Sequence, residues 1–229
     1  MLATKQSEAS PIACLKARPG VPQETGAAGL QHLRIRAKRE ALLYVPETTV
    51  GYAAPLAIML HGAGGNAEQG IGLLNDYADA AKVILLAPES RKSSWDIISD
   101  ARYGPDVEFI DECLEEVFSR YRIDPERIAL GGFSDGASYA LSLGLSNGSL
   151  FRYILAFSPG FMVPVRIEDR PRIFISHGTR DEVLPIGPCS RKVVRALQTY
   201  ELPVTYREFE GPHTVPAQMK EEALEFFVS

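Results

Sequence analysis

Residues 127–136 read RIALGGFSDG and place Ser134 at the centre of a Gly-x-Ser-x-Gly pattern. An apolar run leads into the serine, and a stretch that suits a helix, 137–145, follows it. This order of strand, tight turn and helix is what a nucleophile elbow requires. Gly132 and Gly136 fit such a turn, because a Cβ at either position would crowd it. We therefore predict Ser134 as a catalytic nucleophile, although the five residues alone also suit a glycine-rich turn in which the serine caps the helix.

Short apolar runs alternate with helical stretches along the rest of the chain. Strands are expected at 30–37, 41–45, 56–60, 83–87, 128–133, 153–157, 172–176 and 204–209, and helices at 68–81, 106–121, 134–145, 190–200 and 216–227. The alternation predicts an α/β fold with a mostly parallel central sheet and helices on both faces. The first two strands, joined by a charged turn at 38–40, predict an N-terminal antiparallel hairpin at the sheet edge. In such sheets, functional sites lie beyond the carboxyl ends of the strands.

The length of 229 residues fits one domain whose core needs no disulfide or metal to hold it together. We expect this domain to span 29–229. Residues 1–28 are rich in Pro, Gly, Ala and Ser, so we expect them to form a flexible or surface-wrapping extension.

Charge and cysteine content exclude several classes of protein. The net charge of −5 comes without a basic stripe and argues against a nucleic-acid partner. Cys14, Cys113 and Cys189 are too widely spaced for a disulfide framework or a zinc site, and free thiols are commonest in a reducing compartment. We see no secretory signal and no run of ~20 apolar residues. We expect a cytoplasmic protein with no cofactor, metal or stable membrane anchor; its oligomeric state is left open.

A serine nucleophile needs a base, and the chain has four histidines. His213 is favoured because it follows a strand, lies in a loop that Pro212 stiffens, and comes late in the chain. His61 and His177, each at the end of a strand and before a glycine, are the alternatives; they fit better as braces of their turns.

A carboxylate must orient the base, and Asp181 is the favoured one because its segment directly follows a strand. Glu182 is the neighbour to exclude, and Asp169 lies before the strand, on the wrong side of the sheet. With Asp181 the triad order is Ser, Asp, His, which is the order of the α/β-hydrolase arrangement.

An oxyanion hole needs two N–H donors aimed at the developing charge. The N–H of Asp135 comes with the elbow. The loop 60–66 follows an early strand and is rich in glycine; we favour the N–H of Ala63, with Gly64 as the alternative. A glycine-rich loop can also hold phosphate, but the Gly-x-Gly-x-x-Gly pattern and the Walker lysine are both missing.

Several of these segments together resemble a known family. They read LHGAGGN at 60–66, WD at 95–96, GGFSDG at 131–136, HGTRDEVLP at 177–185 and GPH at 211–213. The chain resembles the phospholipase/carboxylesterase family of α/β-hydrolases, which includes acyl-protein thioesterases, and more loosely the polyhydroxybutyrate depolymerase and feruloyl esterase group. The resemblance runs from about residue 41 to the C-terminus. It implies that Ser134, Asp181 and His213 form the triad and that Ala63 and Asp135 supply the oxyanion N–H groups.

The resemblance also implies a substrate site with Gly64, Trp95 and Phe161 on its walls, Trp95 on the acyl side; packing is the other interpretation of this lone tryptophan. Two departures stand out. Asp135 replaces the usual glutamine, and we expect its carboxylate to point away from the oxyanion. Phe161 follows Ser-Pro-Gly where the family more often has Ser-Gly, so it shapes the pocket differently. Without an insertion that could form a lid, we expect a shallow, open groove.

These features predict a serine hydrolase that cleaves small-molecule carboxylic esters or thioesters through an acyl-enzyme intermediate. An acyltransferase that uses an alcohol in place of water would share the same site. A binding protein that kept the fold and lost the chemistry is the third possibility.

Overall fold

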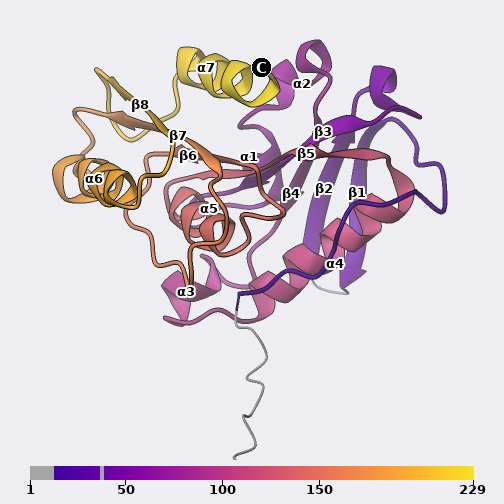
Figure 1. The fold of residues 1–229 in the computed structure, drawn as a ribbon, viewed down its shortest axis with the longest axis horizontal. Helices are drawn as coiled ribbons and strands as arrows, with labels where there is room; N and C mark the ends of the chain where they lie inside the picture. The colour runs from indigo at the N-terminus through magenta and orange to yellow at the C-terminus, as the bar shows by residue number, and fades with distance from the viewer. Residues whose placement is uncertain (1–12, 37–38) are drawn as a thin grey trace, which may run out of the picture.

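The computed structural model describes residues 13–36 and 39–229. The strands of this part form one sheet of eight, in the order β1-β2-β4-β3-β5-β6-β7-β8 (Figure 1). β2 pairs antiparallel with both β1 and β4, and all other neighbours pair in parallel. The mostly parallel sheet with an N-terminal antiparallel hairpin is therefore confirmed.

The strands lie close to where the apolar runs predict them. Their bounds are β1 Gly29–Arg36, β2 Arg39–Val45, β3 Ala54–Leu60, β4 Ile84–Pro88, β5 Ile123–Phe133, β6 Tyr153–Phe157, β7 Arg172–Gly178 and β8 Val204–Phe209. Of the turn predicted at 38–40, the first residue lies outside the described residues and the other two already belong to β2. β5 starts five residues earlier than predicted: Ile123 already pairs with Ala54 of β3, and a register shift then passes over residues 124–127 before Ile128 pairs with Leu56.

The helices differ from the prediction in two places. Their bounds are α1 Ala67–Ile71, α2 Asn75–Ala81, α3 Asp96–Ser99, α4 Pro105–Arg120, α5 Asp135–Ser146, α6 Lys192–Thr199 and α7 Ala217–Val228, with a 3-10 turn at Glu47–Thr49 and a π turn at Gly187–Arg191 before α6. The single helix predicted at 68–81 is wrong: α1 ends at Gly72, a poor helix former, and Leu74 has non-helical torsions before α2 begins. The short α3 was not predicted from the sequence.

Helices cover both faces of the sheet, as predicted. α4, α5 and α6 pack their apolar side chains on one face, and α1, α2 and α7 pack on the other. Figure 1 shows α7 and α2 on the opposite side of the sheet from α4 and α5. β5 runs through the middle of the sheet, so its carboxyl end opens between these two helical layers.

The described part of the N-terminal segment, 13–28, lies along α4. The backbone N–H groups of Lys16 and Ala17 both donate to Asp111 of α4, at 2.8 and 2.9 Å. Leu15 is buried, and its N–H donates to Asn147 just after α5 at 2.9 Å. Whether residue 28 divides an extension from a domain stays a prediction.

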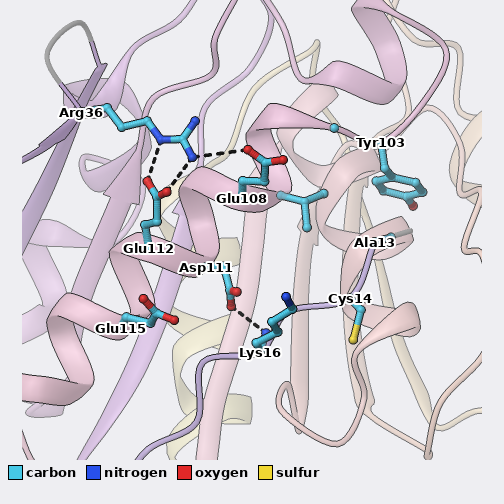
Figure 2. A pocket seen from close by; sticks show the side chains of 11 residues that line it. Ala13, Cys14, Lys16, Arg36, Tyr103, Glu108, Asp111, Glu112 and Glu115 are labelled. Atoms are coloured by element: carbon cyan, nitrogen blue, oxygen red, sulfur yellow. Dashed lines mark hydrogen bonds and ion pairs between the residues drawn. The ribbon is translucent and has the colours of Figure 1, made fainter. Parts of the chain in front are cut away.

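A cavity of about 470 Å³ lies between this segment, β1 and α4 (Figure 2). Its wall is acidic, but Arg36 bridges two of the carboxylates, Glu108 and Glu112. None of the predicted catalytic residues lines it. This cavity therefore lies where the N-terminal segment meets β1 and α4, apart from the site described next.

Candidate active site

Ser134 stands at the sharp turn between β5 and α5. Its torsions, φ 57° and ψ −117°, lie in a region that L-residues avoid, which is the strain expected of a nucleophile elbow. The turn closes tightly on β3: a Cβ on Gly136 would lie 2.3 Å from the carbonyl oxygen of Leu60, and one on Gly132 would lie 2.6 Å from the same atom. Glycine is therefore required at both positions.

The three predicted triad residues meet at this turn. The Nε2 atom of His213 lies 2.9 Å from the Oγ atom of Ser134. The Nδ1 atom of the same ring lies 2.5 Å from Oδ2 of Asp181. The ring also packs on Phe133, with the ring centroids 4.6 Å apart. A hydroxyl, an imidazole and a carboxylate thus form one unbroken hydrogen-bonded chain from three different loops.

Asp181 is held as a buried anion. Its Oδ1 accepts the N–H groups of Val183 at 2.9 Å and Leu184 at 2.8 Å, so the loop folds around the carboxylate. Burial alone would raise the pKa of Asp181, but the Leu184 N–H and the contact with His213 outweigh it and lower the pKa below its usual value. The carboxylate therefore stays ionised and can fix the tautomer of His213.

The other two candidate histidines brace loops next to the site. His177 is fully buried, with Nε2 3.1 Å from Oδ2 of Asp181 and 2.8 Å from the carbonyl oxygen of Leu184. His61 accepts the N–H of Ser90 at 3.0 Å through Nε2. Burial lowers the pKa of both imidazoles, so both rings are held neutral. Neither histidine forms a hydrogen bond with the Ser134 hydroxyl, whose histidine partner is His213.

The predicted oxyanion donors belong to the start of α5 and to the loop after β3. Asp135 is the first residue of α5, where amide N–H groups have no partner within the helix. The N–H of Gly64 donates to the carbonyl oxygen of Ser93 at 2.5 Å, whereas no backbone acceptor in the described part of the chain takes the N–H of Ala63. Of the two loop candidates, Ala63 is thus the one whose N–H is free to bind an oxyanion.

The carboxylate of Asp135 has a partner that the sequence did not indicate. The hydroxyl of Ser94 donates to its Oδ2 at 2.5 Å. This bond ties the carboxylate to the segment after β4; that it points away from the developing charge stays a prediction.

Trp95 lies deeper than a substrate-lining residue would. Its side chain is fully buried and stacks on Tyr139, with the ring centroids 5.2 Å apart. Its indole N–H donates to the carbonyl oxygen of His61 at 2.9 Å. The indole therefore supports the loop 60–66, which we call the oxyanion loop because it carries the predicted donor Ala63. Phe161, in contrast, is only partly buried and packs against the same core cluster, so it remains a candidate for the wall of the site.

Two buried carboxylates fix the segment 89–106 that carries Trp95. Asp106 accepts from the Nη2 atom of Arg39 at 2.7 Å and from the N–H of Asp96 at 2.8 Å. Asp96 accepts the hydroxyl of Tyr139 at 3.0 Å. Burial, helped by the nearby Asp106, raises the pKa of Asp96. The sequence offered no signal for this network beyond the presence of the acidic residues themselves.

Among residues 13–36 and 39–229, no group of three or more His, Cys, Asp or Glu side chains is placed to hold a metal ion. No helix in the same ranges has the length and apolar character needed to cross a membrane.

Two family models match this chain. The phospholipase/carboxylesterase model matches residues 107–228, more than half of the chain, and includes Ser134, Asp181 and His213. The model of the esterase PHB depolymerase group matches residues 40–163 and includes the oxyanion loop. Together they cover the elements that carry the site.

Similarities to individual proteins agree with the two family models. The chain is 31% identical over 170 residues to the "Putative esterase NocK" of Nocardia uniformis subsp. tsuyamanensis, a match that covers 71% of this chain and 44% of that protein. The chain thus spans less than half the length of this relative. Two solved structures share the fold: an S-formylglutathione hydrolase from Staphylococcus aureus, with a TM-score of 0.70 and 14% identity, and a phospholipase/carboxylesterase from Dyadobacter fermentans, with a TM-score of 0.65 and 21% identity. The matches cover 92% and 84% of this chain and 100% and 97% of those chains.

Proposed function

We propose that this chain, which belongs to the phospholipase/carboxylesterase family of the α/β-hydrolases, hydrolyses small carboxylic esters or thioesters through an acyl-enzyme on Ser134. The observation that supports this most is the hydrogen-bonded chain from Asp181 through His213 to the Ser134 hydroxyl. A serine hydroxyl is a weak nucleophile unless an adjacent base takes its proton. Here the base is in contact and is itself oriented by a buried anion.

The first half of the reaction forms the acyl-enzyme. Nε2 of His213 takes the Ser134 proton while Oγ attacks the substrate carbonyl carbon. The carbonyl oxygen becomes an oxyanion, which the N–H groups of Ala63 and Asp135 stabilise. His213 then gives its proton to the departing alcohol or thiol, and the bond from that group to the acyl carbon breaks.

The second half releases the acid. Water attacks the acyl carbon and loses a proton to His213, and the bond to Ser134 Oγ breaks as the serine regains that proton. An alcohol in place of water would give acyl transfer on the same residues. Hydrolysis is the proposal because the residues already in place need only water as co-substrate.

Two further expectations belong with this proposal. The three cysteines are free, which suits a reducing compartment, and we propose that the protein works in the cytoplasm. We also propose that 29–229 forms the hydrolase domain and that no nucleic acid is a partner, given the net charge of −5.

The test is Ser134→Ala, assayed on p-nitrophenyl acetate and on an acetyl thioester. We expect kcat to fall by about 10⁴- to 10⁶-fold. A fluorophosphonate should label the wild type at Ser134 and leave the variant unlabelled. Ser119→Ala, an α4 serine that donates to a backbone carbonyl, is the matched control and should keep full activity. Undiminished hydrolysis by Ser134→Ala would overturn the proposal; no hydrolysis and no labelling of the folded wild type would favour a binding protein.

A further inference from the structure

A ladder of serines begins at the nucleophile and runs along α5. Ser138, Ser142 and Ser146 are fully or almost fully buried and follow Ser134 at intervals of four, which places them on one face of the helix. The hydroxyls donate to the carbonyl oxygens of residues 134, 138 and 142, at 3.1, 2.7 and 2.8 Å. Such bonds back to the preceding turn do not favour a helix, so a run of three calls for another explanation.

The same three hydroxyls hold a segment that crosses the helix. We call residues 159–165, which follow β6, the strap. Its backbone N–H groups at Gly160, Val163 and Val165 donate to the hydroxyls of residues 138, 142 and 146, at 2.9, 2.9 and 3.0 Å. Each hydroxyl thus donates one hydrogen bond within the helix and accepts one from the strap. Alanines at these positions would leave the three N–H groups of the strap without partners.

Tyr103 also holds the strap. Its hydroxyl donates to the carbonyl oxygen of Val163 at 3.1 Å. The strap has no helix or strand of its own. The path of the strap is therefore set by Tyr103 and by the three serines of α5, the helix that starts after Ser134.

The strap begins close to the turn that carries Ser134. The carbonyl oxygen of Phe157, just before it, accepts the N–H of Ser134 at 2.9 Å. Within the strap, a Cβ on Gly160 would lie 3.5 Å from the side chain of Leu184, whose N–H binds the catalytic Asp181. Beside Leu184, Val183 is 67% exposed. The start of the strap thus lies against the loop 181–184, which carries Asp181 and exposes the apolar side chain of Val183.

The two faces of the sheet separate the strap from the base. Phe133, under the His213 ring, packs with the cluster on the α7 face. Phe161 and Met162 of the strap pack with the clusters on the α5 face. A substrate whose leaving group takes the proton of His213 would have its alcohol on the His213 side, which leaves the strap side for the acyl group.

We propose that the strap forms the acyl-side wall, that Phe161 contacts the acyl chain, and that Ser138, Ser142 and Ser146 are positioning residues that select an apolar acyl group larger than acetyl. The proposal rests on the esterase function proposed above. It assigns chain-length preference to hydroxyls that do not touch the substrate.

The experiment compares Ser142→Ala, Ser142→Thr and Phe161→Ala by kcat/KM on p-nitrophenyl esters from acetate to octanoate, which share one leaving group. We expect Ser142→Ala to lower the octanoate-to-acetate ratio about tenfold, mainly through KM, as loss of contact to one or two methylenes would. Phe161→Ala should lower the ratio at least as much. Ser142→Thr keeps a hydroxyl and should restore part of the ratio, whereas Ser119→Ala should leave it unchanged.

The outcomes separate the two proposals. If hydrolysis depends on Ser134 but both Ser142→Ala and Phe161→Ala leave the ratio unchanged, the strap is not the acyl wall and the esterase proposal stands. If Ser142→Ala and Phe161→Ala instead change kcat/KM across a series of acetyl esters that differ in their alcohol, the strap faces the leaving group and the inference is wrong. Phe161 is partly exposed, so its variant tests the idea even if Ser142→Ala fails to fold.

Discussion

The two sides of Ser134, the proposed nucleophile, are held in different ways. On the acid–base side, short loops after β7 and β8 are joined by backbone bonds, such as the N–H of Arg180 to the carbonyl oxygen of Gly211 at 2.9 Å, and the His213 side chain remains 14% exposed. On the oxyanion side, the loop 61–66 rests on the segment 89–106, which buried charges and a stacked tryptophan hold in place. In the proposed mechanism the first side transfers the proton, and the second holds the oxyanion donors on a support that belongs to the core.

This contrast predicts which substitutions lower activity and which lower stability. The His213 side chain on the acid–base side is partly exposed and can be removed without opening the core, so its loss should affect the rate. A side chain under the oxyanion loop has no contact with the reacting atoms, so its loss should affect the free energy of unfolding. The four predictions that follow test this division.

The largest effect is expected at the base. His213→Ala removes the proton acceptor of Ser134 and should lower kcat on p-nitrophenyl acetate by about 10⁵- to 10⁶-fold. The midpoint of urea unfolding should stay close to that of the wild type, because the ring is partly exposed and lies at the end of a loop. His32→Ala, on the exposed face of the β1–β2 hairpin, is the control and should retain activity. A large loss of stability in His213→Ala would contradict the division.

The opposite pattern is expected under the oxyanion loop. Asp106→Ala leaves the buried guanidinium of Arg39 without its partner and should destabilise the protein by about 3–5 kcal/mol, measured by urea unfolding. Asp100→Ala breaks exposed pairs with Arg91 and Lys92 in the same segment and should change stability little. Equal unfolding curves for the two variants would show that the buried pair does not hold this segment.

The contrast also explains how far the sequence could predict the site. Ser134, Asp181 and His213 each follow a strand, and parallel strands bring their carboxyl ends together, so their meeting point could be derived from order alone. The depth of Trp95, the Ser94–Asp135 bond and the serine ladder depend on where loops cross in space. The serines at 138, 142 and 146 are visible at a helical spacing, but nothing in the sequence says that a segment after the next strand crosses them.

The break between α1 and α2 could not be predicted for a similar reason. It lies at 72–74, where Gly72 follows the last residue of α1 and Leu74 has non-helical torsions. A periodic pattern read along 68–81 contains no information on the torsions of single residues, and it therefore joined two short helices into one. The packing of α1 is equally invisible to it: a Cβ on Gly70 would be 2.6 Å from the carbonyl oxygen of Met59 in β3.

A smaller effect is expected at the junction of the two sides. Ser94→Ala removes the hydroxyl that holds the Asp135 carboxylate and should lower kcat about tenfold, because a freed negative charge next to the oxyanion opposes its formation. Ser94→Thr keeps the hydroxyl and should restore activity. In an Asp135→Asn background the Ser94→Ala effect should shrink, as a double-mutant cycle would measure. An unchanged effect would mean that Ser94 acts on something other than this charge.

The smallest effect concerns the pH dependence of stability. The hydrogen bonds to Asp181 lower its pKa in the folded state, so its ionised form stabilises the fold above the unfolded-state pKa of about 3.9, and this stabilisation is lost as the pH falls through the lower folded-state pKa. Asp181→Asn has no charge to lose. The difference in unfolding free energy between wild type and Asp181→Asn should therefore be largest near neutral pH and should shrink below about pH 4. Because the carboxylate is buried, 1 M salt should leave this difference largely intact, which separates it from surface pairs. A difference that grows on acidification would mean that burial, and not the surrounding N–H groups, dominates at this carboxylate, and the acid–base side would then carry a structural cost after all.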